Sequence, residues 1–185
     1  MKNPNIKIFA VSGKAQHGKD TFAEILYEEL TNKGHRVIMT HYADLVKYIA
    51  RTFFNWNGEK DERGRSLLQY VGTDVVRKQR PDYWVQFVLD IINLFGDNWD
   101  YVIIPDTRFP NEVDMLKEYY DKVEHIRVVR PNFKSNLTEE QLNHISEVAL
   151  DNVEPDIKIL NNGTIDDLRS KVISYIINKE SAVNE

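Results

Sequence analysis

Two glycines and a lysine, Gly13, Gly18 and Lys19, separate an apolar run from a helical pattern near the start of the chain. The preceding run IKIFAVS (6–12) is rich in residues that favour strands, and residues 21–33 repeat apolar side chains at the spacing of one helix face. Glycine allows backbone conformations that turn N–H groups toward a common anion, and the start of a helix adds the positive end of its dipole. The order of strand, glycine turn and helix therefore predicts a phosphate-binding loop.

The loop segment GKAQHGKDT (13–21) has the spacing G-x-x-x-x-G-K, but Asp20 stands where the usual pattern has a serine or threonine. A carboxylate is also a hard oxygen ligand, so Asp20 can bind Mg²⁺ directly or through water, while Thr21 keeps a hydroxyl for a phosphate. Two plainer interpretations stay open: a turn without a ligand, and Asp20 as a first-turn carboxylate that favours the helix dipole. A Rossmann dinucleotide site is disfavoured, because Lys14 and Ala15 occupy the place of its second glycine. We expect an ATP site formed by Gly13, Lys14, Ala15, Gln16, His17, Gly18, Lys19, Asp20 and Thr21.

The rest of the chain continues to alternate between strand and helix patterns. A second strand is expected over residues 35–43, a third in the apolar run YVIIP (101–105) and a fourth over 124–130, with one more in DIKILNN. An almost uninterrupted apolar run such as YVIIP is typical of a central parallel strand covered on both faces. The alternation predicts an α/β fold with a doubly wound parallel sheet of about five strands and helices on both faces. One domain is expected to occupy residues 1–185.

Two local signals mark helix boundaries. Pro81 divides residues 65–95 into two expected helices, because proline suits the first turn of a helix and not its interior. The pair Thr138 and Gln141 has the spacing of a capping box, which predicts a helix from there to about Leu150.

Charge and composition exclude several kinds of partner. The formal net charge of −5 gives no basic surface for a phosphate backbone, so nucleic acid is not expected as a partner. The N-terminus lacks the apolar run of a secretory signal, and the most apolar later stretch is short and contains Asp90, so we expect no membrane segment. The absence of cysteine fits a reducing compartment. We therefore expect a cytoplasmic protein.

Five segments together are similar to the deoxynucleoside monophosphate kinases of bacteriophages and their bacterial relatives, a family of P-loop kinases. The segments are GKAQHGKDT (13–21), HYADLVK (41–47), LLQYVGTDVVRKQRPDYW (67–84), PDTRFPNE (105–112) and HISE (144–147). The chain departs from the family pattern at His17, where serine is common, and at Thr107, where valine is usual. The resemblance implies a P-loop NTPase fold and transfer of the γ-phosphoryl group of ATP to a deoxynucleoside monophosphate, with Mg²⁺, in the cytoplasm of a host cell.

The chemistry of such a transfer gives roles to the residues that match. Cations are needed on the donor and acceptor sides, because phosphoryl transfer depends on positioning and charge neutralisation. The catalytic candidates are Lys19, Asp106, Arg108 and Arg130, and the metal candidates are Asp20 and Asp106. The acceptor-binding candidates are Asp44, Lys47, Gln69, Arg77, Trp84 and Arg108. Plainer interpretations stay open here too: Asp44 as a helix N-cap, Trp84 as a core residue, and Asp106 with Arg108 as a surface ion pair.

Two segments are expected to surround the ligands. A helical segment at about 44–95 is expected to bind the acceptor, and a lid at about 131–150 is expected to close over the donor phosphates. Lys134 is the only lysine or arginine in that lid, so Arg127, Arg130 or Lys14 would have to compensate. His144 and Glu147 are three residues apart and could form a surface pair on the lid helix.

The sequence leaves two other functions open, and it does not fix the oligomeric state. The alternatives are a P-loop kinase for another small phosphate ester, such as phosphomevalonate, and a nucleotide-binding switch without an acceptor. The expected partners are ATP and a deoxynucleoside monophosphate, with a homodimer as a possible assembly.

Overall fold

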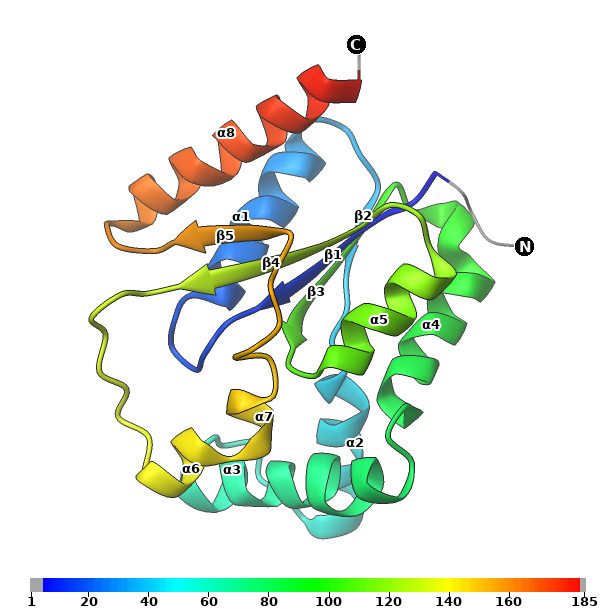
Figure 1. The fold of residues 1–185 in the computed structure, drawn as a ribbon. Helices are drawn as coiled ribbons and strands as arrows, with labels where there is room; N and C mark the ends of the chain where they lie inside the picture. The colour runs from blue at the N-terminus through cyan, green and yellow to red at the C-terminus, as the bar shows by residue number, and fades with distance from the viewer. Residues whose placement is uncertain (1–4, 184–185) are drawn as a thin grey trace.

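A five-stranded sheet in which every pairing is parallel organises the computed structural model, which describes residues 5–183 (Figure 1). The strands are β1 (Lys7–Ser12), β2 (Val37–Met39), β3 (Tyr101–Thr107), β4 (Val123–Val129) and β5 (Ile157–Leu160). They lie in the order β2-β3-β1-β4-β5, so β1 is central and β3 and β4 flank it. This order confirms the doubly wound parallel sheet that the alternating patterns predict.

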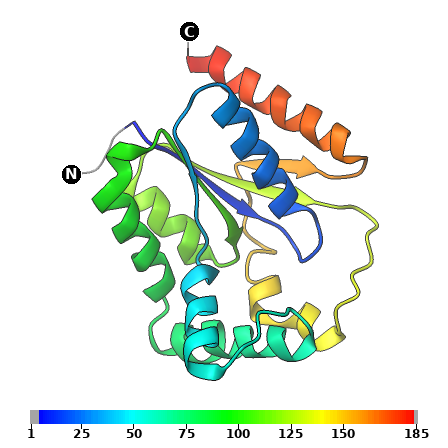
Figure 2. The ribbon, with the colours of Figure 1, turned by 180° about the vertical axis from the view of Figure 1, so that it is seen from behind.

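Helices connect the strands and cover both faces of the sheet (Figures 1 and 2). They are α1 (Lys19–Asn32), α2 (Ala43–Phe54), α3 (Glu62–Gln69), the π-helix η1 (Tyr70–Arg77), α4 (Tyr83–Phe95), the 3₁₀-helix η2 (Gly96–Asn98), α5 (Pro110–Tyr119), α6 (Glu139–Asn143), α7 (Ile145–Val148) and α8 (Ile165–Val183). The division at Pro81 is confirmed, since one helical run ends before it and α4 begins after it. Within residues 5–183, no helix combines the length and apolar character that crossing a membrane requires.

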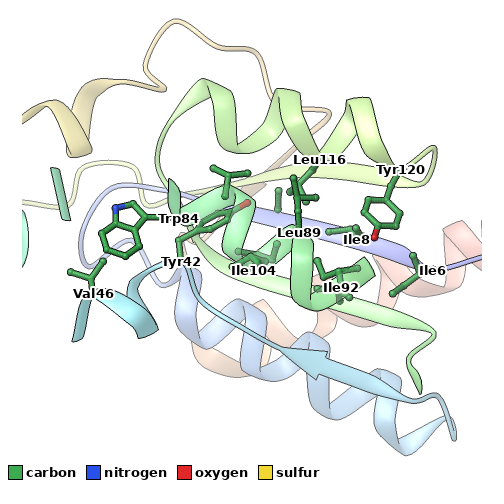
Figure 3. Packing of buried hydrophobic residues seen from close by; sticks show 14 of the residues in the cluster. Ile6, Ile8, Tyr42, Val46, Trp84, Leu89, Ile92, Ile104, Leu116 and Tyr120 are labelled. Atoms are coloured by element: carbon green, nitrogen blue, oxygen red, sulfur yellow. The ribbon is translucent and has the colours of Figure 1, made fainter. Parts of the chain in front are cut away.

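Strand β1 separates two apolar cores, because successive side chains of a strand point to opposite faces. Ile8 and Ala10 pack with α4 and α5 on one face, and Phe9 and Val11 pack with α1 and α8 on the other. Figure 3 shows the first of these cores, in which side chains from α2 and α4 meet the sheet. Consecutive side chains of β3 from Val102 to Ile104 have no exposed surface, which confirms the buried central strand.

The second strand is shorter than the sequence predicts. Pairing with β3 stops at Met39, and α2 begins at Ala43. The carboxylate of Asp106, at the end of β3, accepts hydrogen bonds from the backbone N–H groups of Tyr42 and Ala43, which fixes these residues as the start of a helix. The expectation of a strand over 35–43 is therefore wrong at its end, and Asp44 lies in the first turn of α2 instead of at the end of a strand.

The expected lid helix is interrupted. The capping box of Thr138 and Gln141 is confirmed, but α6 ends at Asn143, and the extended backbone of His144 separates it from α7. Nδ1 of His144 accepts a hydrogen bond from the N–H of Ser146, so this side chain caps α7. In Figure 1, α6 and α7 lie beside α3, beyond the carboxyl ends of the strands.

Candidate functional site

The loop between β1 and α1 has the shape of a phosphate cradle. Its backbone takes positive φ values at Gln16 (65°) and Gly18 (88°), and the N–H of His17 donates to the carbonyl of Lys14 at 3.2 Å. A Cβ on Gly13 would lie 2.5 Å from the backbone oxygen of Val128 in β4, so no larger residue fits there. The first glycine therefore lets the loop approach the sheet, and the second allows the turn into α1.

Lys19 and Asp20 lie between two cavities at the carboxyl edge of the sheet. The side chain of Lys19 is 10% exposed, and its Nζ lies 3.1 Å from Oδ1 of Asp20. Both residues line each of the two cavities. One cavity, the loop cavity, lies between the phosphate loop and the β5–α8 connection. The other, the helical cavity, is bounded mainly by α2, α3, η1 and the end of β3.

The helical cavity is rich in cations. Its lining includes Lys19, Lys47, Lys60, Arg65, Arg77 and Arg108. Burial, followed by the charge of Lys47, lowers the pKa of Lys60. Four carboxylates offset part of this charge: Glu112 and Glu147 pair with arginines at the wall, Asp20 pairs with Lys19, and Asp106 accepts two backbone N–H groups. The remaining positive charge suits a ligand that carries phosphate.

Arg77 and Glu112 form a buried ion pair in the wall of the helical cavity. Nη2 of Arg77 donates to Oε1 of Glu112 at 2.6 Å, and the guanidinium lies 3.9 Å from the ring centre of Phe109. Oε2 of Glu112 accepts the backbone N–H groups of Arg108 and Phe109 at the start of α5. Burial raises the pKa of Glu112 to about 7, although Arg77 opposes the shift. The pair fixes the turn that carries Arg108.

Asp106 holds the start of α2 against the end of β3. Its two carboxylate oxygens accept the N–H groups of Tyr42 at 3.0 Å and Ala43 at 2.9 Å. Tyr42, the N-cap of α2, makes no side-chain cap itself, so Asp106 supplies the cap from a distant segment. Asp106 also lines the helical cavity, where its role as a metal ligand stays a prediction.

Arg108 is tied to the expected lid. Its Nη1 donates to the carbonyl of Ser146 at 3.0 Å and pairs with Oε1 of Glu147. His144 and Glu147 do not form the surface pair that their spacing allows: Glu147 bonds Arg108 and the loop, while Nε2 of His144 lies 3.8 Å from Asp74 in η1. The lid segment thus contacts both the phosphate loop and the helical cavity.

The structure brings together most of the acceptor candidates. The helical cavity is lined by Lys47, Gln69, Arg77, Trp84 and Arg108. Asp44 is not among the lining residues; its side chain is 55% exposed and accepts a hydrogen bond from Nζ of Lys47 at 2.9 Å. Asp44 also lies 3.3 Å from Nδ1 of His41, which lines the cavity as Lys47 does, so Asp44 can act on a ligand there through either of these side chains.

Trp84 is primarily a core residue. It is 2% exposed, and its indole N–H donates to the carbonyl of Gly72 at 2.8 Å. Figure 3 shows its ring beside Val46, within the core on the α4 side of the sheet. The plainer interpretation of Trp84 is thus the one that packing favours, with part of the side chain at the cavity wall.

The loop cavity is lined by part of the expected ATP site, without Gly13, Lys14, Ala15 and His17, and by residues that the sequence did not single out. Gln16, Gly18, Lys19, Asp20, Thr21 and Arg130 line it, together with Asn161 and Thr164. The side-chain amide of Asn161 donates to the carbonyl of His17 at 3.0 Å and supports the loop. Arg130 lies over the ring of Phe133, 4.5 Å from its centre, and its backbone N–H donates to Nδ1 of His17. Burial, then the charge of Lys14, lowers the pKa of His17.

Several lining residues were not singled out from the sequence, and four polar ones, Lys60, Arg65, Asn161 and Thr164, show why. Lys60 belongs to a charged segment without periodicity, and such segments are usually solvated loops. Arg65 stands at the start of the helical pattern expected over 65–95, where nothing set it apart from other surface cations. The several cations in NGEKDERGR (57–65) were the feature of the sequence that could have indicated a phosphate-binding wall. Asn161 and Thr164 follow β5, and their place at the sheet edge was predictable only from the strand order.

The oxygen ligands for a metal are few. Among residues 5–183, no group of three or more histidine, aspartate or glutamate side chains is arranged to hold an ion. Asp20 is 66% exposed beside the loop, and Thr21 lines the loop cavity next to it. Mg²⁺ commonly takes one or two carboxylates together with substrate phosphates and water, so this donor set fits an ion that arrives with a nucleotide.

Comparison with known proteins places residues 38–172 in a family model described as deoxynucleotide monophosphate kinase. The deoxynucleotide monophosphate kinase of Enterobacteria phage T4 is 40% identical over 110 residues, which cover 58% of this chain and 43% of that protein. The chain thus spans less than half the length of this phage relative. A putative deoxynucleotide monophosphate kinase of Acanthamoeba polyphaga mimivirus is 28% identical over 92% of this chain and 96% of its own length.

Solved kinase structures share the fold. The APS kinase of Mycobacterium tuberculosis in complex with AMPPNP and APS superimposes with a TM-score of 0.54 at 11% identity, over 94% of this chain and 98% of that one. The shikimate kinase of Aquifex aeolicus gives a TM-score of 0.52 at 13% identity, over 94% of this chain and 98% of that one. At these identities the similarity establishes the fold alone.

Proposed function

The chain belongs to the deoxynucleotide monophosphate kinase family, and we propose that it transfers the γ-phosphoryl group of ATP to a deoxynucleoside monophosphate. The observation that carries the proposal is the place of Lys19, which lines both the loop cavity and the helical cavity. A group that moves from a donor in one cavity to an acceptor in the other passes this ammonium. In-line transfer between two anions requires such a shared cation.

The donor triphosphate lies along the phosphate loop in this proposal. The backbone N–H groups around Gly18 and the start of α1 bind its oxygens, and Thr21 adds a hydroxyl. The loop cavity leaves room for the donor nucleoside between the loop and residues 161–164. Arg130 is the cation of this cavity that stands outside the loop and serves the donor side.

The acceptor monophosphate lies in the helical cavity. Arg108 has the fork geometry that binds a phosphate through two N–H groups, and Lys47 adds a point charge at the α2 wall. Gln69 of α3 offers a side-chain amide to the acceptor base. Because Arg77 is held by Glu112, its role is to shape the wall and to set the turn that carries Arg108.

Mg²⁺ accompanies the donor in this proposal, and Asp20 is the residue that would hold it, directly or through water. When bound, the ion neutralises charge that develops on the β- and γ-phosphates. We expect Asp20→Ser to weaken the Mg²⁺ requirement at modest cost to activity, because Asp20 repels the triphosphate when no ion is present. Identical Mg²⁺ titration curves for the variant and the wild type would contradict this role.

The reaction is tested by coupled ADP release with ATP and Mg²⁺. Each deoxynucleoside monophosphate, its ribose counterpart and phosphomevalonate are compared as acceptors. Turnover that depends on a deoxynucleotide supports the proposal and gives the base preference. Turnover with phosphomevalonate alone would favour a kinase of small phosphate esters, and slow ADP release that ignores every acceptor would favour a nucleotide-dependent switch.

Location and assembly belong to the same proposal. A nucleotide kinase draws on the ATP of the cytoplasm, which in a phage infection is that of the host cell. The lack of cysteine agrees with a reducing compartment. The absence of a nucleic-acid partner stays a prediction from the sequence, and a homodimer stays a possible assembly.

A further inference from the structure

The carboxylate of Glu147, in the short helix α7, joins two parts of the site that are far apart in the sequence. Its Oε2 accepts the backbone N–H of Ala15 in the phosphate loop at 3.0 Å. Its Oε1 pairs with Nη1 of Arg108, at the end of β3. The side chain is 6% exposed, so these partners, and not water, satisfy its charge. One carboxylate therefore contacts the donor loop and the arginine assigned to the acceptor.

Further contacts fix the backbone around Glu147. Nζ of Lys14 donates to the carbonyl of Glu147 at 2.9 Å and pairs with Asp151 at 2.6 Å. Nη1 of Arg108 also donates to the carbonyl of Ser146, and His144 caps the helix. Three side chains, those of Lys14, Arg108 and His144, thus hold the backbone around this carboxylate, and Asp151 holds Lys14, so its position does not depend on the short helix alone.

The pairing determines which way Arg108 presents its fork. Both of its hydrogen bonds to α7 leave from Nη1. The Nε and Nη2 atoms carry three more N–H groups, and this edge of a guanidinium can bind two phosphate oxygens at once. An arginine held at one end loses less conformational freedom when it binds an anion at the other.

We infer that Glu147 is a positioning residue that holds Arg108 toward the acceptor phosphate and fixes the phosphate loop at a set distance from it. The inference rests on the proposed kinase function and deepens it. Glu147 lines the helical cavity, but both of its carboxylate oxygens have protein partners, so in this inference it binds neither substrate. Its effect on the reaction passes through Arg108 on one side and through the amide of Ala15 on the other.

Glu147→Gln distinguishes this role from simple packing, because it keeps the size of the side chain. A glutamine has one oxygen and one NH₂ group, so it can accept from Ala15 or from Arg108 but not from both. Glu147→Asp keeps the charge but is one methylene shorter, so it too can reach only one partner. The aspartate variant serves where the glutamine variant fails to fold. Glu140→Gln is the matched control, since it removes the same charge from an exposed position of the same segment.

The experiment is a double-mutant cycle on kcat/KM for the acceptor, measured by ADP release. Wild type, Glu147→Gln, Arg108→Ala and the double variant are compared, with the thermal unfolding midpoint of each. We expect Glu147→Gln to lower kcat/KM by roughly 10-fold or more through KM for the acceptor, within the coupling range of contacting residues. In the Arg108→Ala background the same change should cost less than about 3-fold. Glu140→Gln should retain wild-type values.

Equal losses in the two backgrounds would overturn the inference, because Glu147 would then act independently of Arg108. An effect confined to the unfolding midpoint would also overturn it, since a purely structural residue behaves in that way. If the wild type turns over no acceptor, the proposed function itself fails. If the wild type is active and the effects of the two substitutions simply add, the role of Glu147 is rejected while the proposed kinase function stands.

Discussion

Replacing Asp106 should detach the start of α2 from the sheet. Asp106→Ala removes two hydrogen bonds from backbone N–H groups to a carboxylate, at 3.0 and 2.9 Å. A hydrogen bond to a charged group contributes about 1.5–3 kcal/mol, so the two together set an upper bound of roughly 3–6 kcal/mol. Because Asp106 is half-buried at a cavity, water can reach the freed amides, and we expect a loss near the lower end, about 3 kcal/mol.

The assay is urea unfolding followed by circular dichroism, with linear extrapolation to water. Asp106→Asn keeps one oxygen acceptor but presents an NH₂ group to the other amide, so it should lose at least half as much stability as the alanine variant. Asp44→Ala is the control, because this exposed carboxylate in the first turn of α2 pairs only with side chains in the described structure, namely Lys47 and His41. Its loss should stay below about 1 kcal/mol.

A loss of less than about 1 kcal/mol for Asp106→Ala, or one equal to that of Asp44→Ala, would refute the capping role. The same variants decide the second role that the sequence suggests for this residue. If Asp106 also holds Mg²⁺, Asp106→Asn requires more of the ion for half-maximal activity. If capping is its whole role, the Mg²⁺ titration curve keeps its midpoint while stability falls.

Three further outcomes follow from single contacts. Lys19→Ala should remove roughly 3 kcal/mol or more of transition-state stabilisation, and near-wild-type turnover would reject the shared-cation assignment. Gly13→Ala should lower the thermal unfolding midpoint more than Gly34→Ala, because the added Cβ meets the backbone of β4 at the first position and open space at the second. Burial raises the pKa of Glu112 from 4.5 to about 7, so the folded protein holds this proton more tightly than the unfolded chain does. The resulting stabilisation is complete below pH 4.5 and is lost as the pH rises through 7. The stability of wild type relative to Glu112→Gln should therefore fall between pH 4.5 and 7.5 in urea unfolding; a constant difference would contradict the shifted pKa.

In residues 131–150, the expected lid, the local sequence pattern predicts the start of a helix correctly but not its end. The capping box at Thr138 correctly predicts where α6 begins, because its two hydrogen bonds involve residues three positions apart. The predicted end of this helix, at about Leu150, was wrong: α6 ends at Asn143, because His144 leaves the helical conformation to cap α7. No residue within one helical turn of His144 distinguishes one continuous helix from two helices separated there. The contacts of α7 with Arg108 and Lys14, both distant in the sequence, favour the separation.

The sequence by itself determined the glycine turn between β1 and α1, the alternation of strands and helices, and the buried central strand. Each of these depends on residues that are neighbours in the chain, so spacing and side-chain type are enough to predict them. The tertiary structure alone decided the partners of Asp106, which lie 63 and 64 residues away, and the pairing of Arg108 with Glu147, 39 residues on. Such contacts depend on the order β2-β3-β1-β4-β5, which brings the carboxyl ends of distant strands to one edge. The two cavities that meet at Lys19 exist only because of that order.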